Sequence, residues 1–139
     1  MLKIFTALFI LATTFGCAEK IEHDVDLASK RAFEFAETTF VRRNLDKGYA
    51  LLTDKARSYV PVDKFTETVS EMHRTGYPTR ITVVGAAPAI PGEMIVNVVL
   101  RGEDSGKPSH YTVTVAGTAS TDYHVTTFGL GAIPLLPSG

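Results

Sequence analysis

The 139 residues amount to 15.1 kDa, which is the size of a single domain. Hydrophobic residues make up 45% and charged residues 21% of the chain, a composition that excludes an intrinsically disordered protein. The 14 basic and 15 acidic side chains nearly cancel, which excludes the strongly basic surface that nucleic-acid binding needs. The single cysteine excludes a disulfide framework and any metal site built from several cysteines.

The N-terminus has the layout of a secretory signal peptide. Lys3 is followed by an uncharged, mostly apolar run from Ile4 to Phe15. This run is too short to cross a bilayer, since a spanning helix needs about 20 apolar residues. A buried core helix is the other interpretation, but no charged residue gives the run a solvent-facing side. We therefore expect residues 1–16 to be a leader that is removed on export.

The segment TTFGC, which ends at Cys17, resembles a bacterial lipobox, in which a small residue precedes the acylated cysteine. Thr14 stands where leucine is commonest. The resemblance implies cleavage after Gly16, diacylglycerol on the Cys17 sulfur and a third acyl chain on its amino group, and two or more chains anchor a protein stably. The alternative is an ordinary signal peptide with an incidental cysteine. Ala18, rather than aspartate, follows the cysteine, which implies the outer rather than the inner membrane.

The expected location is therefore the bacterial cell envelope, with the protein anchored by lipid and facing the periplasm. Residues 17–23 form the acylated cysteine and a tether, residues 24–128 a single α+β domain, and residues 129–139 a tail punctuated by glycine and proline. The six tether residues after Cys17 span at most about 20 Å when extended, so the domain is expected close to the membrane surface.

The first helix is expected over residues 24–43, because apolar side chains recur on one arc and charged ones lie opposite. Asn44 is expected to end it in a left-handed conformation. Asp46 is expected to cap a short second helix over residues 47–53, which Gly48 weakens.

Two further segments complete the helical half. Residues 54–59 are either another turn of helix or an irregular link. Pro61 suits the first turn of a helix whose apolar positions recur at spacings of three and four through Met72. Gly76 is expected to stop this helix, and Pro78 prevents its continuation.

After Pro78 the pattern changes to that of strands. Residues 80–87, 93–101, 109–116 and 123–128 are rich in β-branched residues or alternate between apolar and polar side chains. Short connections between them imply an antiparallel sheet, and helices that precede such a sheet define the α+β class.

Strand parity predicts which face the helices cover. The covered face is expected to carry Met94, Val96, Val98, Leu100, Tyr111, Val113, Val115, Tyr123 and Val125. The other face is expected to carry Asn97, Val99, Arg101, His110, Thr112, Thr114, His124, Thr126 and Phe128. Two interpretations of this mixed face stay open, a homodimer interface and a solvated face of a monomer. The tail, residues 129–139, either lies over an edge of the sheet or stays loose.

Three short segments carry a resemblance to a known family. They are NLDKGYALLT (residues 44–53), VPVDKF (60–65) and TDYHV (121–125), the last with Tyr123 where tryptophan is usual. Together with the order of the elements they resemble the nuclear-transport-factor-2-like superfamily over residues 24–128. The resemblance implies a cone-shaped fold, in which a curved sheet wraps a long helix around a cavity that is empty, filled by side chains, or catalytic.

Isomerases and dehydratases of this superfamily use an Asp or His base with a Tyr or acid that holds the oxyanion. His73 is the candidate base, and Tyr111 or Tyr123 supplies the hydroxyl; Phe65 and Met94 complete the candidate pocket. A histidine at a helix C-terminus and amphipathic tyrosines also have ordinary structural roles, and those interpretations stay open. Glu34 is expected to project into solvent.

No catalytic, cofactor or metal residue follows from the sequence alone. His110 and His124 share a face, but any register that keeps the apolar faces together separates them by more than about 10 Å. His23 falls in the tether. No glycine-rich phosphate loop precedes a helix.

Two classes of function follow. The first hypothesis is a non-catalytic, lipid-anchored envelope protein that binds a small apolar ligand, a peptide or an envelope partner. The alternative is a small cone-type isomerase, dehydratase or hydrolase that uses His73 with Tyr111 or Tyr123. A fold alone does not decide between them, because one fold hosts many functions.

Overall fold

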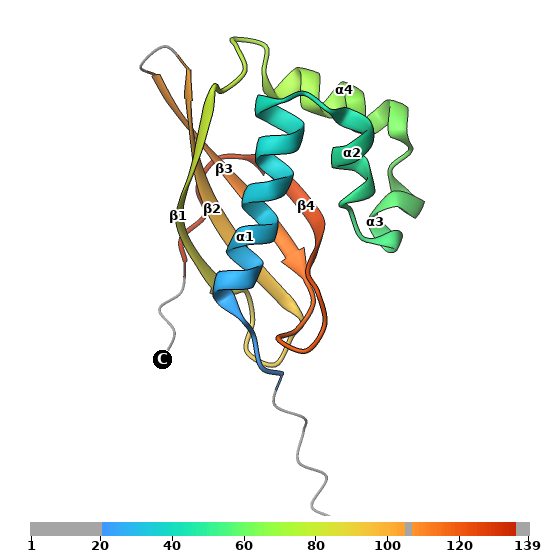
Figure 1. Ribbon diagram of the computed structural model, residues 1–139, viewed down its shortest axis with the longest axis vertical. Coiled ribbons are helices and arrows are strands. Elements are labelled where there is room, and N and C mark those ends of the chain that lie inside the picture. Colours follow the sequence, from blue (N-terminus) through green and yellow to red (C-terminus); the bar gives the residue numbers. More distant parts are fainter. Residues whose placement is uncertain (1–20, 105–106, 136–139) are drawn as a thin grey trace, which may run out of the picture.

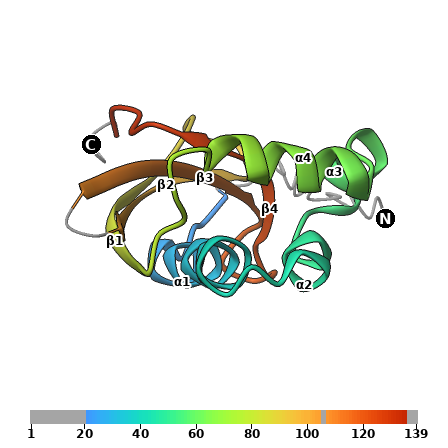
Figure 2. The same ribbon diagram turned by 90° about the horizontal axis from the view of Figure 1, so that it is seen from above.

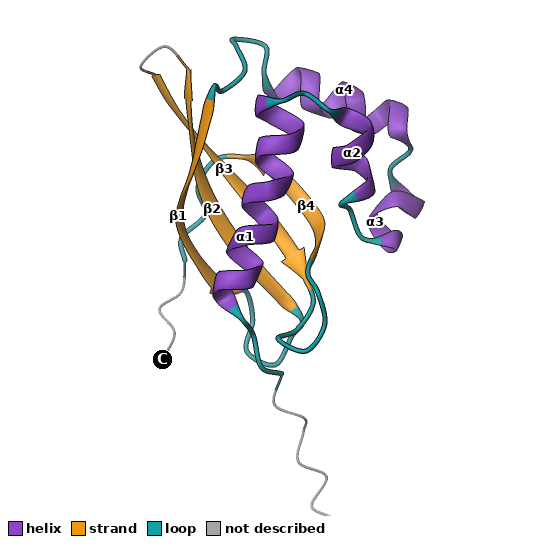
Figure 3. Cartoon of the chain, in the orientation of Figure 1, coloured by secondary structure: helices purple, strands orange, loops and turns teal. Residues whose placement is uncertain are grey.

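The computed structural model describes residues 21–104 and 107–135. Within these residues, helices precede a four-stranded antiparallel sheet, so the predicted α+β class is confirmed (Figures 1 and 3). The predicted leader, the lipobox and Cys17 lie outside the described residues. None of the described helices is long and apolar enough to cross a membrane.

Helix α1 (Val25–Ala36) packs lengthwise against the sheet. Its first turn is capped by Asp24, whose carboxylate accepts a hydrogen bond from the Leu27 N–H at 3.0 Å. Its face toward the sheet is fully buried, as the predicted arc requires, at Ala28, Ala32, Phe35 and Ala36. The helix contacts all four strands, and Figure 2 shows the sheet bending around it.

The single helix expected over residues 24–43 is divided. After α1 the backbone widens into a π-helical segment, η1 (Glu37–Val41), and Arg43 takes the left-handed conformation expected of Asn44, with φ 55°. Asn44 instead caps α2 (Leu45–Ala50) by accepting from the Lys47 N–H at 3.2 Å, the role predicted for Asp46. The expectation was wrong by two residues because Asn44 gains more by capping the next helix than by ending the previous one.

Gly48 allows α2 to lie directly on η1. A Cβ at this position would collide with the Thr39 hydroxyl, so no larger residue fits without moving the two segments apart. The glycine that weakens α2 by propensity therefore has a packing role.

Two more helices complete this half of the molecule. Residues 54–59 form a helix, α3 (Asp54–Tyr59), whose start is capped by the Thr53 hydroxyl. Helix α4 (Val62–Met72) begins directly after Pro61, which was expected in its first turn and lies at its N-cap, and the helix buries Phe65 and Val69. Helices α2, α3 and α4 gather beyond strand β4, beside one end of the sheet (Figure 1).

The sheet is a meander of β1 (Arg80–Pro88), β2 (Ile95–Asp104), β3 (Lys107–Ala116) and β4 (His124–Leu130). The register between β2 and β3 confirms the predicted pairing of the covered face. Val96 lies opposite Val115, Val98 opposite Val113, and Leu100 opposite Tyr111. All six of these side chains are buried.

Two side chains depart from the predicted parity. Met94 precedes β2 and is 55% exposed instead of covered, because the strand begins at Ile95. Phe128 lies in the core rather than on the outer face. The cause is a bulge in β4: Thr114 pairs with Thr127 but Val115 pairs with Val125, so Thr126 is an extra residue. One extra residue turns every later side chain to the other face.

The outer face of the sheet is partly covered by the chain's own C-terminal segment. The N–H of Gly131 donates to the His110 carbonyl at 2.8 Å, and the Thr112 hydroxyl donates to the Gly131 carbonyl at 2.7 Å. Val99, expected as an apolar centre of this face, is only 3% exposed. The homodimer through this face stays a prediction, and it would have to use surface that this segment leaves free, such as that around exposed His124.

Replacing Phe35 or Phe65 with alanine is expected to lower the free energy of unfolding by about 3–5 kcal/mol, because each ring is fully buried among other rings. Glu34→Ala is the matched control on the same helix. The Glu34 side chain is 41% exposed and forms a partly exposed ion pair with Arg31, so its loss is expected to stay within about 0.5 kcal/mol. Urea denaturation measures all three, and a large loss at Glu34 would contradict this packing.

Candidate functional site

The space between the helices and the sheet is filled by aromatic rings. Phe35 lies at the centre, with ring centroids 5.7 Å from Phe40, 6.3 Å from Phe65 and 5.1 Å from Phe128. All but Phe128 are fully buried. The space on the concave side of the sheet is closed by the protein's own side chains, so any functional surface must lie at the ends of this core or on its outside.

The five residues predicted to line one pocket are separated by the structure. His73 and Tyr111 meet at one end of the core, Phe65 lies in the ring cluster, and Tyr123 lies at the opposite end of the core, beside the start of α1. Met94 is exposed outside it. The pairing of His73 with Tyr111 is therefore present, and that of His73 with Tyr123 is absent.

His73 is held on both sides. Its Nδ1 lies 2.6 Å from the Val69 carbonyl, which can only accept, so Nδ1 carries a proton and donates it. Its Nε2 lies 2.9 Å from the Tyr111 hydroxyl and, in the neutral ring, accepts from it. The ring is also stacked on Tyr77 at 4.5 Å and packs against Phe40 at 4.9 Å.

The environment keeps this pair neutral. Burial lowers the pKa of His73, and the positive charge of Arg43 adds to the decrease, against the opposing effect of the Val69 carbonyl. Burial, with a smaller contribution from Asp104, raises the pKa of Tyr111 to about 12. With both ring nitrogens engaged and only 4% of the residue exposed, His73 offers no lone pair to a substrate.

A polar pocket of about 420 Å³ adjoins Tyr111, at the end of the sheet where the end of β2 and the start of β3 lie side by side. Its wall includes Asp104, Lys107 and Ser109, and His73 is not among the residues that line it. The backbone at Gly76, with φ 138°, brings the wall close to the Asp104 carboxylate. The pocket therefore presents charged groups beside a tyrosine whose hydroxyl is already bonded, and it lacks an accessible base of the predicted kind.

Tyr123 has a structural role at the other end. Its hydroxyl accepts from the Asp24 N–H at 3.0 Å and lies 3.0 Å from His23 Nδ1. The other nitrogen of His23 donates to the Glu93 carbonyl at 2.7 Å. The tyrosine thus holds the chain before α1, whose His23 in turn bonds to the loop before β2, and its hydroxyl is not available for an oxyanion.

A second hollow, of about 550 Å³, lies at this same end and is mainly apolar. It is open to solvent and is lined by Ile21, Thr53, Lys55, Gly92, Glu93, Met94, Ile95, Ala116 and Thr126. Of the predicted pocket residues only Met94 belongs to it. Sequence patterns missed the hollow because it combines the chain before α1, the start of α3 and the outward side of β2 and β3, which no local periodicity links.

The described residues contain no cluster of three or more His, Cys, Asp or Glu that could hold a metal ion. His110 and His124 lie six positions apart along β3, since Ala116 pairs with His124. That separation is about 20 Å at the usual rise per residue, in keeping with the predicted distance. The acids of the described helices lie at the surface or in the half-exposed ion pairs of Glu34 and Glu37.

The chain matches no protein-family model, no curated protein and no solved structure at a significant level. The function of the chain is therefore inferred from its own residues.

Acidification is expected to destabilise the protein through His73. Because the pKa of His73 is lower in the folded chain than the ordinary value of about 6.5, the unfolded chain binds the extra proton first. The stability that neutral His73 contributes is complete above about pH 6.5 and is lost as the pH falls from there toward the lowered pKa. Urea unfolding between pH 5 and 7.5 measures this loss.

His73→Phe is the control, since it keeps an aromatic ring between Phe40 and Tyr77 but cannot titrate. It is expected to lower stability at pH 7 by about 1–3 kcal/mol, because the Tyr111 hydroxyl loses its partner. Its stability should then depend less on pH than that of the wild type. An equal slope in both proteins would contradict the assignment of the acid sensitivity to His73.

Proposed function

We propose that this protein is a non-catalytic, lipid-anchored component of the bacterial cell envelope, held at the periplasmic face of the outer membrane. The lipobox that ends at Cys17, behind an uncharged apolar leader, carries this proposal. The chain enters the described domain at Ile21, only four residues later. A tether this short keeps the domain next to its membrane rather than extended into the periplasm.

The side chains of the core support the non-catalytic hypothesis over the enzymatic alternative. A cone-type isomerase or dehydratase needs a base that meets the substrate in an apolar cavity. His73, the candidate base, is buried and hydrogen-bonded at both nitrogens, and the middle of the core is filled by phenylalanine rings. The contact of His73 with Tyr111 is explained as a hydrogen bond between two buried polar side chains, each of which supplies the partner that the other needs.

We further propose that the ligand is a small apolar molecule, or an apolar segment of an envelope partner, and that it occupies the hollow beside Ile21 and Met94. Its size lies in the range of small-molecule sites, and apolar atoms dominate its wall. Lys55 and Glu93 stand at the same hollow and supply polar groups that could orient a ligand.

The finer fold also belongs to this proposal. A long helix inside a curved antiparallel sheet, with the helices ahead of the strands in the described residues, is the arrangement that the resemblance to the nuclear-transport-factor-2-like superfamily implies (Figure 2). We propose that the chain is a member whose cone is filled by side chains. In such a member the outside of the cone, rather than its cavity, meets the ligand.

Cys17→Ser is expected to abolish acylation and membrane retention, because the sulfur that receives diacylglycerol is removed. Metabolic labelling with radioactive palmitate and fractionation of the bacterial envelope measure both properties. Ala18→Ser, beside the cysteine, is the control and should be acylated like the wild type. Free secretion of the wild-type protein with an unmodified Cys17 thiol would contradict the anchor.

Filling the hollow is expected to weaken ligand binding without unfolding the protein. Ala116→Phe places a ring in the hollow from the end of β3, whereas Thr82→Phe places the same ring on an exposed part of β1 as a control. The fluorescence of N-phenylnaphthylamine, an apolar probe, reports binding. We expect roughly tenfold weaker binding for Ala116→Phe alone; equal binding by both variants would remove the hollow as the site.

A further inference from the structure

The end of the domain where the chain enters is built from three segments. The residues before α1, the loop between β1 and β2, and the loop between β3 and β4 all lie at this end, which is the lower one in Figure 1. The N–H of Ala119 donates to the Glu22 carbonyl at 2.7 Å, and His23 bonds to the Glu93 carbonyl. The entering chain is thus bonded to both loops.

The loop between β1 and β2 exposes two large apolar side chains at this end. Ile90 is 53% and Met94 55% exposed, although the residues at the tip of a hairpin loop are usually polar. Pro91 and Gly92, the latter with φ 84°, set the turn between them. Ile21 lines the hollow next to Met94, so the apolar surface continues onto the entering chain.

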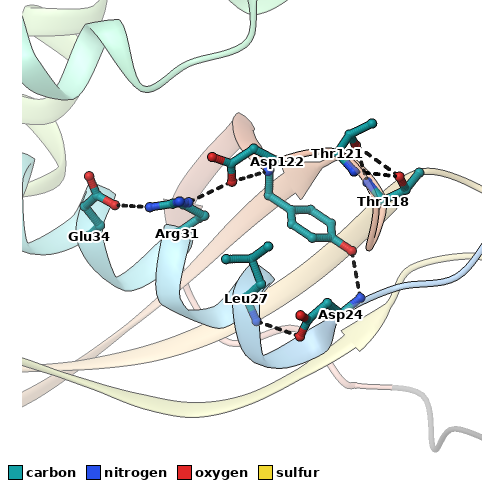
Figure 4. Close-up of polar contacts among 8 residues, drawn as sticks. Asp24, Leu27, Arg31, Glu34, Thr118, Thr121 and Asp122 are labelled. Atoms are coloured by element: carbon teal, nitrogen blue, oxygen red, sulfur yellow. Dashed lines mark hydrogen bonds and ion pairs between the residues drawn. The ribbon is translucent and has the colours of Figure 1, made fainter.

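The loops are fixed to the domain, so their exposure is a property of the fold. Arg31 of α1 donates to the Asp122 carboxylate at 2.7 Å, and the same carboxylate accepts from the Tyr123 N–H at 2.8 Å (Figure 4). The Gly117 N–H donates to the Met94 carbonyl at 2.9 Å, which joins the two loops to each other. Ile90 and Met94 are therefore presented outward by a braced end of the molecule.

The position of Cys17 determines what this end faces. Three residues lie between Cys17 and Ile21, so the four steps from one to the other span at most about 14 Å when fully extended. A lipid-modified Cys17 lies in the membrane interface, so the entering chain cannot hold Ile21 farther than that from the bilayer. The two loops bonded to this chain are then at the end of the domain nearest to the lipid, and of the two the loop between β1 and β2 carries the exposed Ile90 and Met94.

We propose that Ile90 and Met94 insert into the surface of the bilayer and hold the domain upright on it. This inference rests on the proposed lipid anchor and adds a second, non-covalent contact of the fold itself. Apolar side chains at the interface enter by about 5–10 Å, to the boundary between headgroups and acyl chains. Glu93 lies between the two side chains in sequence and stays with the headgroups, which limits the insertion to this depth.

The absence of tryptophan from the chain makes a site-specific test available. Ile90→Trp and Met94→Trp each place a single fluorescent reporter at the proposed contact. Val84→Trp is the matched control, since Val84 is similarly exposed, at 58%, but lies in the middle of β1, six residues before Ile90 and at most about 20 Å from it. All three sites are more than half exposed, so the variants are expected to keep the wild-type circular dichroism spectrum.

The full chain is produced with its own leader, and the acylated protein is reconstituted into vesicles of phosphatidylethanolamine and phosphatidylglycerol with brominated acyl chains. Bromine quenches tryptophan only at short range. We expect roughly half of the tryptophan emission to be lost at residues 90 and 94, because insertion by about 5–10 Å brings these side chains to the boundary of the brominated acyl chains. We expect no loss of emission at residue 84. Quenching at residue 84 equal to that at 90 and 94, or at none of the three, would overturn the proposal.

Flotation of the vesicles separates this inference from the anchor. Protein that floats without quenching at residues 90 and 94 keeps the anchor and rejects the membrane contact. Protein that neither carries lipid nor floats rejects the anchor. The membrane contact is then tested with Ile90→Trp combined with Cys17→Ser. Quenching of this variant by added vesicles supports the contact, and absence of quenching rejects it. A concentration-dependent blue shift at residue 90 without vesicles would mean that a second copy covers the loop, which also rejects the proposal.

Discussion

The packing of α1 against the concave side of one four-stranded meander is the constraint on which the rest of the structure depends. The helix buries three alanines and Phe35 on its face toward the sheet, and it contacts every strand. Phe40, Phe65 and Phe128 fill the remaining space from η1, α4 and β4. Removal of this much aromatic surface from water dominates the stability of so small a domain.

A filled core also governs where polar chemistry can occur. The two tyrosines of the core place their hydroxyls at its opposite ends, and each hydroxyl is bonded to a neighbouring segment. Tyr111 with His73 closes the end beside α4, and Tyr123 with Asp24 closes the end beside the start of α1. His73 and Tyr111, which the sequence suggested as a catalytic pair, thus form a hydrogen bond with each other, as buried polar groups ordinarily do.

The surface left for function lies outside the filled core, and the two ends of the domain differ in character. The end beside Tyr111 has a polar pocket with Asp104 and Lys107. The end where the chain enters has an apolar hollow and two exposed apolar side chains, Ile90 and Met94. Only the second end is connected by a short segment to Cys17, the cysteine of the proposed lipobox, so the character of the surface and the proposed anchor agree.

The sequence by itself determined the elements whose patterns are local. The period of α1 and α4, the start of α4 after Pro61, and the pairing of β2 with β3 follow from side-chain spacing, which backbone geometry translates directly into faces. The class of fold follows from the order of these elements. The buried state of Phe35 and Phe65 was predictable for the same reason.

Only the tertiary structure decided the features that depend on contacts between distant segments. The bulge at Thr126 carried Phe128 into the core, the start of β2 at Ile95 left Met94 in solvent, and residues after β4 bonded to Thr112 on the outer face. A histidine and a tyrosine 38 residues apart met as a closed pair rather than an open site. The alternation of side chains in a strand and their angles around a helix carry no information about these long-range contacts. A single inserted residue or a returning segment changes which residues meet without changing the local sequence pattern.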